Sequence, residues 1–387
     1  MRPLKIAYCI PSLYYPSGME RVLTLKANYL AEHFGHEVHI ILTDGSDRKP
    51  CYPLHPAVRL HNLQLDFDAM YGMPLYRKMI YYLRRQRQFR PRLDRCLNEI
   101  RPDITISLLR RDINLLDKMA DGSVKLGELH FSRYDYRNST NFRLPGWMQR
   151  KIAHYWQKQL LDKLRRLKRF IVLSHEDAAM WAPDLDNVRV IHNPLSFYPE
   201  RQSDCMQKQV VAAGRYVPQK GFDLLIEAWR TVAGRHPDWT LRIYGDGRRD
   251  ELQAQIDAAG LTGSCILEHT TPEIADKFCE SSVFVLSSRF EGFGMVLIEA
   301  MACGVPPVSF ACPCGPRDII ADGQDGLLVP AGDTVQLAEG ICRLIEDDAL
   351  RYKMGSQARK NVDRFRIERI MTQWNDLFEE VLNEKRE

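Results

Sequence analysis

Residues 287–304 read SSRFEGFGMVLIEAMACG, and this stretch decides the fold. The apolar run at 283–286 (VFVL) predicts a buried strand, and the small and apolar residues after the glycine turn predict a helix. A strand that ends in a glycine turn and opens a helix leaves backbone N–H groups free to bind an anion. Two carboxylates, Glu291 and Glu299, stand eight residues apart around that turn. The stretch therefore predicts a pocket that holds a phosphate and several hydroxyls together, as a nucleotide-sugar requires.

The same alternation of strands and helices runs along the whole chain. Strands are predicted at 5–10, 37–42, 103–107, 124–128 and 169–173 in the first half, and at 209–213, 240–244, 265–268, 283–286, 307–309 and 326–328 in the second. Helical patterns separate them, beginning with about 19–34 and ending with about 367–384. Strands that alternate with helices indicate parallel sheets, so we expect an α/β protein with two doubly wound units.

The length of 387 residues also indicates two domains of roughly 190 residues each. A domain linker is expected at 188–207, because Asn193-Pro194 marks a turn and a polar stretch follows it. We assign residues 1–194 to the first domain, 195–364 to the second, and 365–387 to a terminal helix.

Composition and cysteine usage narrow the class of protein. The chain is 45% hydrophobic and 27% charged, as in globular proteins, and no apolar run approaches the ~20 residues that span a bilayer. Its ten cysteines are scattered and no secretion signal precedes the first predicted strand, so we expect reduced thiols and a cytoplasmic location. Cys312-Pro313-Cys314 lacks the partners of a zinc site and is interpreted as two structural thiols.

The two halves of the chain differ sharply in charge. Residues 1–199 hold 32 Lys and Arg against 20 Asp and Glu, a balance of +12, whereas residues 200–387 hold 22 against 30, a balance of −8. Basic and aromatic residues interleave at 76–95 and again at 147–169. Such segments suit an anionic membrane surface, which would place the protein peripherally at the inner face of the cell membrane. Ordinary solvated helix faces remain the alternative, and nucleic acid is not expected because no binding module accompanies the charge.

The two glutamates with seven residues between them resemble the E-x7-E signature of the retaining GT-B glycosyltransferases, family 4 in particular. The resemblance covers most of the chain and is strongest at about 209–331. It implies two Rossmann-like domains facing across a cleft, with the C-terminal helix crossing back onto the first domain. It also implies transfer of a hexose or N-acetylhexosamine from a UDP-sugar, or secondarily a GDP-sugar, to a lipid-linked or polysaccharide-precursor acceptor. Such an enzyme would serve cell-surface glycan synthesis, for example of lipopolysaccharide or capsule.

Roles for the residues of this motif follow from its chemistry and from the resemblance. An ionised carboxylate has two acceptor oxygens that suit a vicinal diol, so Glu299 is expected to bind the ribose hydroxyls of the donor. Glu291 is expected to contact the transferred sugar. Backbone N–H groups facing phosphate or sugar are expected from Phe293, Gly294, Met295 and Val296.

A second motif, residues 213–221 (AGRYVPQKG), follows a predicted strand and supplies two cations. Arg215 can fork onto phosphate oxygens, and Lys220 adds a mobile point charge. The segment resembles the family's G-R-x(3–4)-K-G motif, whose Arg and Lys hold the diphosphate. Two solvated surface cations are the alternative interpretation.

Three further positions are predicted at the cleft. Gly18 lies in a loop, residues 16–20 (PSGME), that resembles the family's G-G-x-E loop, with Ser17 replacing the first glycine. Gly245 lies in a glycine turn, residues 244–247 (YGDG), that resembles the family's G-x-G loop, and the resemblance implies that it forms a wall of the donor cleft. His130 follows a predicted strand, at about the place where the family keeps a histidine facing the donor sugar, and Glu128 is a second candidate there.

No cofactor or catalytic metal is expected. The D-x-D patterns at 66–68 and 184–186 lie outside the context of the glutamate motif and are interpreted as chance. Two other functions remain open. A nucleotide-sugar epimerase of GT-B-like fold would form no glycosidic bond, and a non-catalytic glycan-binding relative would bind the donor weakly or not at all.

Overall fold

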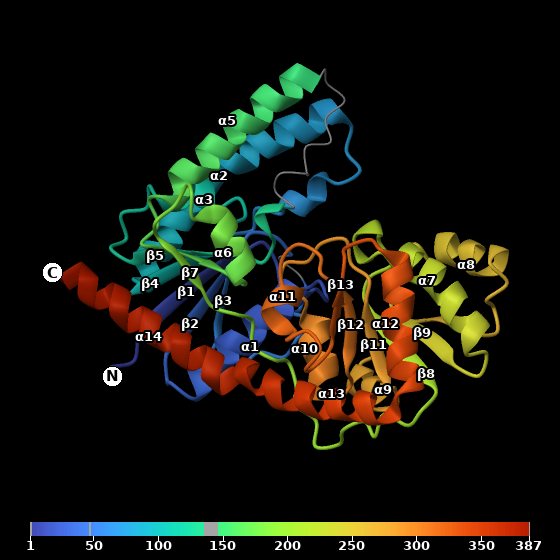
Figure 1. The fold of residues 1–387 in the computed structure, drawn as a ribbon. Coiled ribbons are helices and arrows are strands. Elements are labelled where there is room, and N and C mark those ends of the chain that lie inside the picture. The colour runs from blue at the N-terminus through green and yellow to red at the C-terminus, as the bar shows by residue number, and fades with distance from the viewer. Residues whose placement is uncertain (1, 46–47, 135–145, 387) are drawn as a thin grey trace.

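The computed structural model describes residues 2–45, 48–134 and 146–386, with the backbone alone for 146–150, 152–153 and 386. Two α/β domains lie beside each other, and the C-terminal helix runs along both (Figure 1). Helices α2 and α5 project from the first domain, away from that helix.

Within the described residues, seven parallel strands build the first sheet in the order β3-β2-β1-β4-β5-β6-β7. The strands are β1 Lys5–Ile10, β2 Glu37–Leu42, β3 Arg59–Asn62, β4 Ile104–Ser107, β5 Val124–Glu128, β6 Arg169–Val172 and β7 Val188–Val190. The helices are α1 Gly18–Glu32, η1 Phe67–Met70, α2 Leu75–Ile100, α3 Ile113–Leu116, α5 Gly146–Leu164 and α6 His175–Trp181. The central strand β1 is buried from its second residue onward, as expected where helices cover both faces of a parallel sheet.

In the part of the second domain that the structure describes, six parallel strands follow the order β10-β9-β8-β11-β12-β13. The strands are β8 Gln209–Ala213, β9 Thr240–Tyr244, β10 Cys265–Glu268, β11 Val283–Leu286, β12 Pro307–Phe310 and β13 Leu327–Val329. The helices are η2 Pro218–Lys220, α7 Phe222–Arg235, α8 Arg249–Ala258, α9 Ile274–Cys279, α10 Met295–Ala302, α11 Pro316–Ile319, α12 Thr334–Glu346, α13 Asp348–Asn361 and η3 Val362–Phe365. The prediction of two doubly wound parallel sheets is confirmed.

Two strands were not predicted from the sequence. β3 and β7 are short and form the two edges of the first sheet. An edge strand pairs on one side only and is partly exposed, so its residues need not form a continuous apolar run. β7 therefore occupies the start of the stretch that we expected to be linker.

The C-terminal helix α14, Ile367–Arg386, crosses back onto the first domain as predicted. Its apolar residues recur every three or four positions and so share one face of the helix. That face is buried in the core that α1 and strands β1, β2, β4 and β5 also form, and it consists of Ile370, Met371, Trp374, Leu377, Phe378 and Val381.

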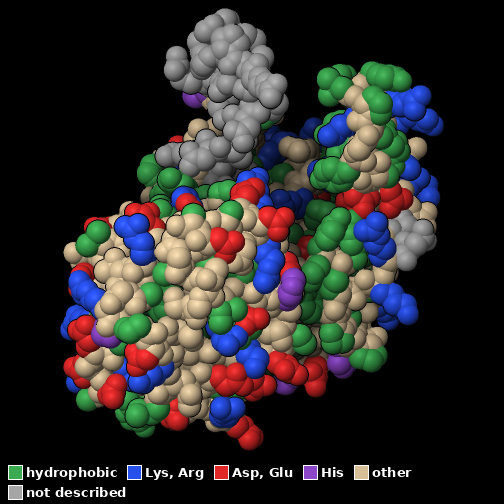
Figure 2. Space-filling model, turned by 90° about the vertical axis from the view of Figure 1, so that its right-hand side faces the viewer, with side chains coloured by type: hydrophobic (Ala, Val, Ile, Leu, Met, Phe, Trp, Pro, Cys, Tyr) green, Lys and Arg blue, Asp and Glu red, His purple; other side chains and the backbone are tan. Residues whose placement is uncertain are grey.

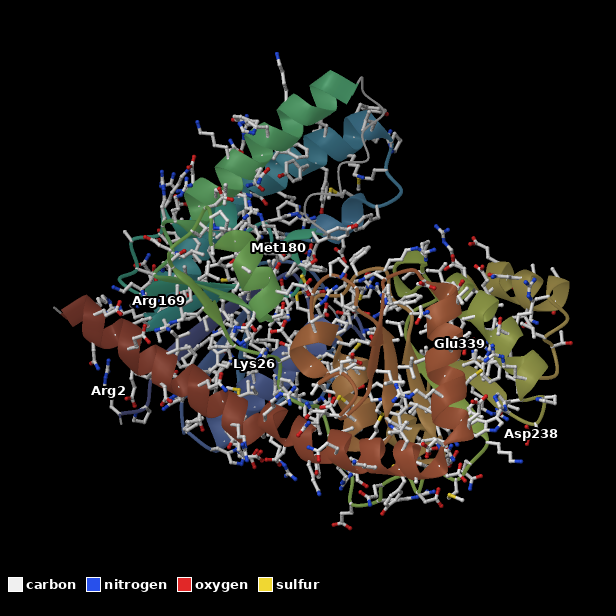
Figure 3. The ribbon with its side chains drawn as sticks, in the orientation of Figure 1. Arg2, Lys26, Arg169, Met180, Asp238 and Glu339 are labelled. Carbon is white, nitrogen blue, oxygen red and sulfur yellow. The ribbon has the colours of Figure 1, made fainter. Side chains whose placement is uncertain are left out.

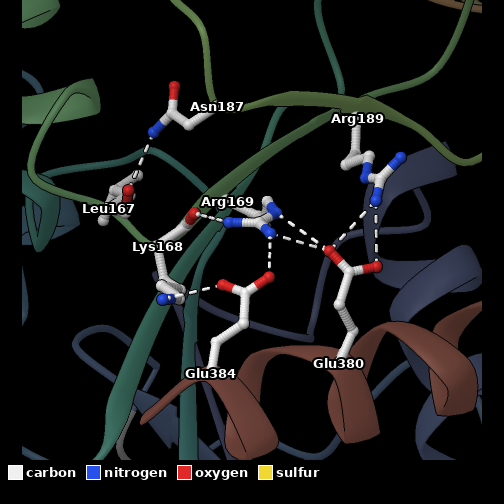
Figure 4. Close-up of polar contacts among 7 residues, drawn as sticks. All are labelled: Leu167, Lys168, Arg169, Asn187, Arg189, Glu380 and Glu384. Atoms are coloured by element: carbon white, nitrogen blue, oxygen red, sulfur yellow. Dashed lines mark hydrogen bonds and ion pairs between the residues drawn. The ribbon is translucent and has the colours of Figure 1, made fainter. Parts of the chain in front are cut away.

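Ion pairs fasten the far end of α14 to the edge of the first sheet (Figure 4). Glu380 accepts from Arg169, at 2.7 Å, and from Arg189, at 2.9 Å. Glu384 pairs with Lys168 at 2.7 Å and also contacts Arg169. These pairs are partly exposed and solvent screens them, so burial of the apolar face is the larger contribution to docking.

Replacing Trp374 by alanine should weaken the docking of α14. The indole is buried within the first-domain core, so Trp374→Ala should cost about 3–5 kcal/mol. Urea unfolding should show a lower midpoint, and limited proteolysis should cleave the C-terminal helix first. Glu384→Gln is the matched control and should change the midpoint far less; equal effects would contradict docking by apolar burial.

Candidate active site

The loops that follow β8 and β11 run in direct contact. A Cβ atom at position 221 would lie 2.1 Å from the carbonyl oxygen of Ser287, and Gly221 also has a φ of +62°. Ser287 Oγ donates to the carbonyl of Lys220 at 3.0 Å, and the N–H of Arg289 donates to the carbonyl of Gln219 at 2.8 Å. Glycine is therefore required at position 221 for the two loops to meet.

This contact brings together the two charged motifs predicted from the sequence. Lys220 Nζ donates to Glu291 Oε1 at 2.6 Å, and Ser288 Oγ donates to the same oxygen at 2.6 Å. Both charged side chains are largely buried. The structure thus places a cation and a carboxylate at the carboxyl ends of two adjacent strands, where ligands of open α/β sheets bind.

Glu299 lies on α10 and is almost fully buried. Ser196 Oγ donates to its Oε1 at 2.7 Å, and Arg21 of α1 pairs with the same oxygen at 3.0 Å. Burial raises the pKa of Glu299, while Arg21 and Ser196 counteract part of that rise. Because α1 belongs to the first domain, the Arg21–Glu299 pair crosses between the domains.

The residues between the two glutamates open α10. Gly294 caps the helix with a φ of 100°, and Met295 and Val296 occupy its first turn. N–H groups of a first helical turn have no partner within the helix and can bind an anion. The ring of Phe293 packs 5.5 Å from His192 and from Phe365, so its side chain serves the core and only its backbone is placed to bind a ligand.

His130 reaches the glutamate motif from the first domain. A Cβ atom at position 292 would lie 2.5 Å from the carbonyl oxygen of His130, so Gly292 lets the two loops touch across the domain boundary. The Nε2 atom of His130 lies 3.2 Å from Glu128 Oε1. The structure therefore places His130 beside the loop that carries Glu291.

Glu128, the second cleft candidate, belongs to a buried ion pair instead. Lys26 Nζ donates to both of its carboxylate oxygens at 2.6 Å, and both side chains are only 1% exposed. Figure 3 labels Lys26 between the first sheet and α14, and its ammonium lies 3.6 Å from the centre of the Trp374 ring. Burial alone would raise the pKa of Glu128, yet Lys26 and His130 outweigh it and lower that pKa to about 2.

The other predicted positions have different surroundings. Arg215 is exposed, and among the described residues no carboxylate lies within ion-pair distance of it. A Cβ atom at position 245 would lie 2.0 Å from the carbonyl oxygen of Gly214, so Gly245 packs one turn against another. Gly18 begins α1, and a Cβ atom there would have open space around it. Donor contacts by these three residues remain predictions.

Three polar partners of the site were missed by the sequence analysis. Ser288 lies inside the decisive stretch, and its spacing of three residues from Glu291 could have indicated the contact. Arg21 directly follows the loop at 16–20, but its partner is far away in the sequence. Ser196 gave no signal, because a lone serine after Asn193-Pro194 predicts only a turn.

A cavity of about 660 Å³ lies in the first domain at the carboxyl ends of its strands. Three tyrosines, two arginines and three carboxylates contribute to its wall: Tyr14, Tyr15, Tyr71, Arg110, Arg111, Glu20, Asp44 and Asp68. The guanidinium of Arg110, which lines the cavity, lies 4.4 Å from the centre of the Phe131 ring, and Phe131 is the residue next to His130 in the sequence. The cavity thus adjoins the loop that meets the glutamate motif. Aromatic faces with charged side chains are suited to bind a sugar.

Two groups of described residues have ligand atoms close enough together to hold a metal ion: His175, His192 and Asp318, and His236, Cys342 and Glu346. Neither contains Glu291 or Glu299. Asp318 of α11 also accepts from the backbone N–H of His175 at 2.6 Å, so its carboxylate caps α6 across the domain boundary.

The sequence resembles known glycosyltransferases. Residues 199–361 match the family model described as Glycosyl transferases group 1. An uncharacterized glycosyltransferase of Haemophilus influenzae is 26% identical over 96% of this chain and 99% of its own length. A poly(ribitol-phosphate) alpha-N-acetylglucosaminyltransferase of Staphylococcus aureus is 26% identical over 94% of this chain and 74% of its own length. The amylovoran biosynthesis glycosyltransferase AmsD of Erwinia amylovora is 33% identical over 50% of this chain and 56% of its own length.

Solved structures share the fold over nearly the whole chain. An S. aureus TarM mutant in complex with fondaparinux, alpha-GlcNAc-glycerol and UDP has a TM-score of 0.75 at 17% identity, covering 97% of this chain and 99% of its own. Sucrose-phosphate synthase from Thermosynechococcus elongatus has a TM-score of 0.79 at 18% identity, covering 98% and 99%. The fold is GT-B, and the sequence relatives support a glycosyltransferase with that fold.

Removing one member of the buried Lys26–Glu128 pair should be strongly destabilising. Lys26→Met leaves the Glu128 carboxylate buried without its cation, which should cost about 3–5 kcal/mol. The double variant Lys26→Met/Glu128→Gln removes both charges and should recover part of that loss. Urea unfolding of the wild type, Lys26→Met, Glu128→Gln and the double variant gives the coupling free energy, and simple additivity would show that the two side chains do not act as a pair.

Proposed function

We propose that the protein is a retaining glycosyltransferase that moves a hexose or N-acetylhexosamine from a UDP-sugar to a lipid-linked or polysaccharide-precursor acceptor. The observation that carries the proposal is the Lys220–Glu291 contact beside the N-terminus of α10 and the buried Glu299. A cation, free backbone N–H groups and a carboxylate are the groups needed to bind a diphosphate and a ribose.

Each residue has a role in this proposal. Glu299 accepts from the ribose hydroxyls, and the first turn of α10 donates to the diphosphate. Lys220 and Arg215 neutralise the charge that grows on the diphosphate as the sugar leaves. Glu291 and His130 face the transferred sugar from opposite sides of the domain boundary. The leaving phosphate itself takes the acceptor proton, so no carboxylate nucleophile is assigned, and we propose that no metal ion or other cofactor takes part.

The cavity of about 660 Å³ supports an acceptor site in the first domain. It adjoins the His130 loop, and its wall belongs to the first domain, whereas Lys220 and Glu299 belong to the second. An epimerase would need no second substrate there. The names of the relatives, which refer to poly(ribitol-phosphate) and amylovoran, also support a polymeric glycan acceptor and cell-surface glycan synthesis for this chain. We place this reaction at the cytoplasmic face of the cell membrane.

Calorimetry with UDP, GDP, ADP and their common sugars, with and without EDTA, tests the donor class. Selective binding of one nucleoside diphosphate that EDTA does not change would support a metal-free transferase. UDP is the expected nucleotide, and the UDP bound in the TarM complex supports this choice. The absence of binding by any nucleotide would favour a non-catalytic relative.

Lys220→Ala should lower the turnover rate by about 10²- to 10³-fold, because it removes a cation positioned beside the leaving diphosphate. Release of UDP from the donor measures this rate. Lys208→Ala is the control, since Lys208 pairs with Asp238 on the exposed surface of the same domain and should leave the rate unchanged. Normal turnover in Lys220→Ala would remove this residue from the site.

Binding of the UDP-sugar should weaken as the pH falls toward 5. Burial raises the pKa of Glu299 above its usual 4.5, so the carboxylate takes up a proton at a higher pH than an exposed glutamate does. Only the ionised form can accept from both ribose hydroxyls. Glu299→Gln should bind more weakly at neutral pH and lose this part of the pH dependence. Calorimetry between pH 7.5 and 5 checks this, and an unchanged pH profile in Glu299→Gln would exclude the assigned role.

A further inference from the structure

The two halves of helix α2 differ in how deeply their side chains are buried. Its buried residues, Phe89, Leu93, Cys96, Leu97 and Ile100, all lie in the second half of the helix. The first fourteen residues, a length of roughly 20 Å at 1.5 Å per residue, contain none of them. They contact the domain at η1, where the Tyr81 hydroxyl donates to the carbonyl of Asp66 at 3.0 Å and the Tyr82 ring lies 6.0 Å from the Phe67 ring. Figure 1 shows α2 and α5 projecting from the first domain on the same side.

The projecting half of α2 exposes a large apolar face, which we call the α2 face. Its residues are Leu75, Tyr76, Met79, Ile80, Tyr82 and Leu83, and Leu75 is 78% exposed. At about 100° per residue these side chains fall within an arc of roughly 160° on the helix. A contiguous exposed apolar face indicates an interaction surface.

Basic side chains occupy the rest of the same helical turns. Arg77, Lys78, Arg84 and Arg85 fall on the arc that the α2 face leaves. Residues 69–93 contain seven Lys and Arg and no Asp or Glu. Among the described residues, no carboxylate lies within ion-pair distance of these four cations. In Figure 2 the lobe at the upper right presents hydrophobic and basic side chains together.

We propose that the α2 face docks the protein onto an anionic membrane surface. The apolar and aromatic side chains enter the interface, and the cations, which have no carboxylate partner among the described residues, contact lipid phosphates. Charge complementarity favours a lipid leaflet over a second copy of this chain, because two α2 helices would bring uncompensated cations together. The described part of α5 also exposes Tyr155 and Trp156.

The position of the α2 face also bears on the acceptor. Tyr71 lines the cavity of about 660 Å³ and stands four residues before the start of the α2 face. A docked helix would therefore hold the mouth of this cavity close to the lipid headgroups. This consequence, a membrane-borne acceptor, rests on the proposed function, whereas docking itself does not.

Vesicle flotation with the full chain tests the proposal. The protein should bind vesicles with 30% phosphatidylglycerol, should not bind pure phosphatidylcholine, and should be released by 0.5 M salt. Arg77→Gln/Arg84→Gln and Met79→Ser/Ile80→Ser should each reduce binding roughly tenfold or more. Lys208→Gln/Arg235→Gln and Val335→Ser, exposed positions of the second domain, are the matched controls and should bind as wild type does.

Three outcomes would overturn the proposal. Failure of the wild-type protein to bind anionic vesicles would overturn the proposal without any variant. Loss of a dimer in Met79→Ser/Ile80→Ser by sedimentation velocity, without vesicle binding, would assign the α2 face to a second copy. Binding to duplex DNA but not to vesicles, weakened in Arg77→Gln/Arg84→Gln, would assign it to nucleic acid. Vesicle binding by a protein with no transferase activity would instead support docking and contradict only the proposed function.

Discussion

The ammonium of Lys26 lies where three elements of the first-domain core meet, namely α1, β5 and α14. Glu128 at the end of β5 accepts from it, and Trp374 of α14 covers it with its ring. A buried charge is stable only while it keeps its partner, so α1, β5 and α14 are fixed relative to one another. The same elements supply what the first domain gives to the cleft: Arg21 from α1 and His130 just beyond β5.

The domain boundary is closed by contacts of different kinds. Gly292 meets the backbone of His130, Arg21 pairs with Glu299, and Asp318 caps the N-terminus of α6. Each contact includes a residue of the second domain within or near the glutamate motif or α11. A nucleotide that enters between the domains must therefore compete with or extend these contacts. Donor binding and the relative position of the domains should be coupled for this reason.

The sequence predicted the elements that burial dictates and missed those that tertiary contacts decide. β1 and β8 match their predicted bounds because a central parallel strand needs apolar side chains on both faces. The edge strands β3 and β7 lack that requirement and were not predicted. Lys220 and Glu291 were both named, but their contact across 71 residues of sequence required the fold.

The buried Lys26–Glu128 pair shows most clearly what cannot be predicted from the sequence. A lysine within a helical pattern is usually interpreted as solvent-facing, and a glutamate at the end of a strand as a cleft residue. These two side chains lie in the core only because α14 crosses over them. Residues whose role is set by a distant partner cannot be assigned from local pattern alone.

The most direct test of the account is the fate of a UDP-sugar incubated with the protein and an acceptor glycan, followed by nuclear magnetic resonance. The account predicts that UDP is released in step with a new glycosidic bond, whose anomeric configuration is that of the donor. An inverted anomeric centre would contradict retention. An isomerised sugar formed without a glycosidic bond would identify an epimerase and contradict the central claim.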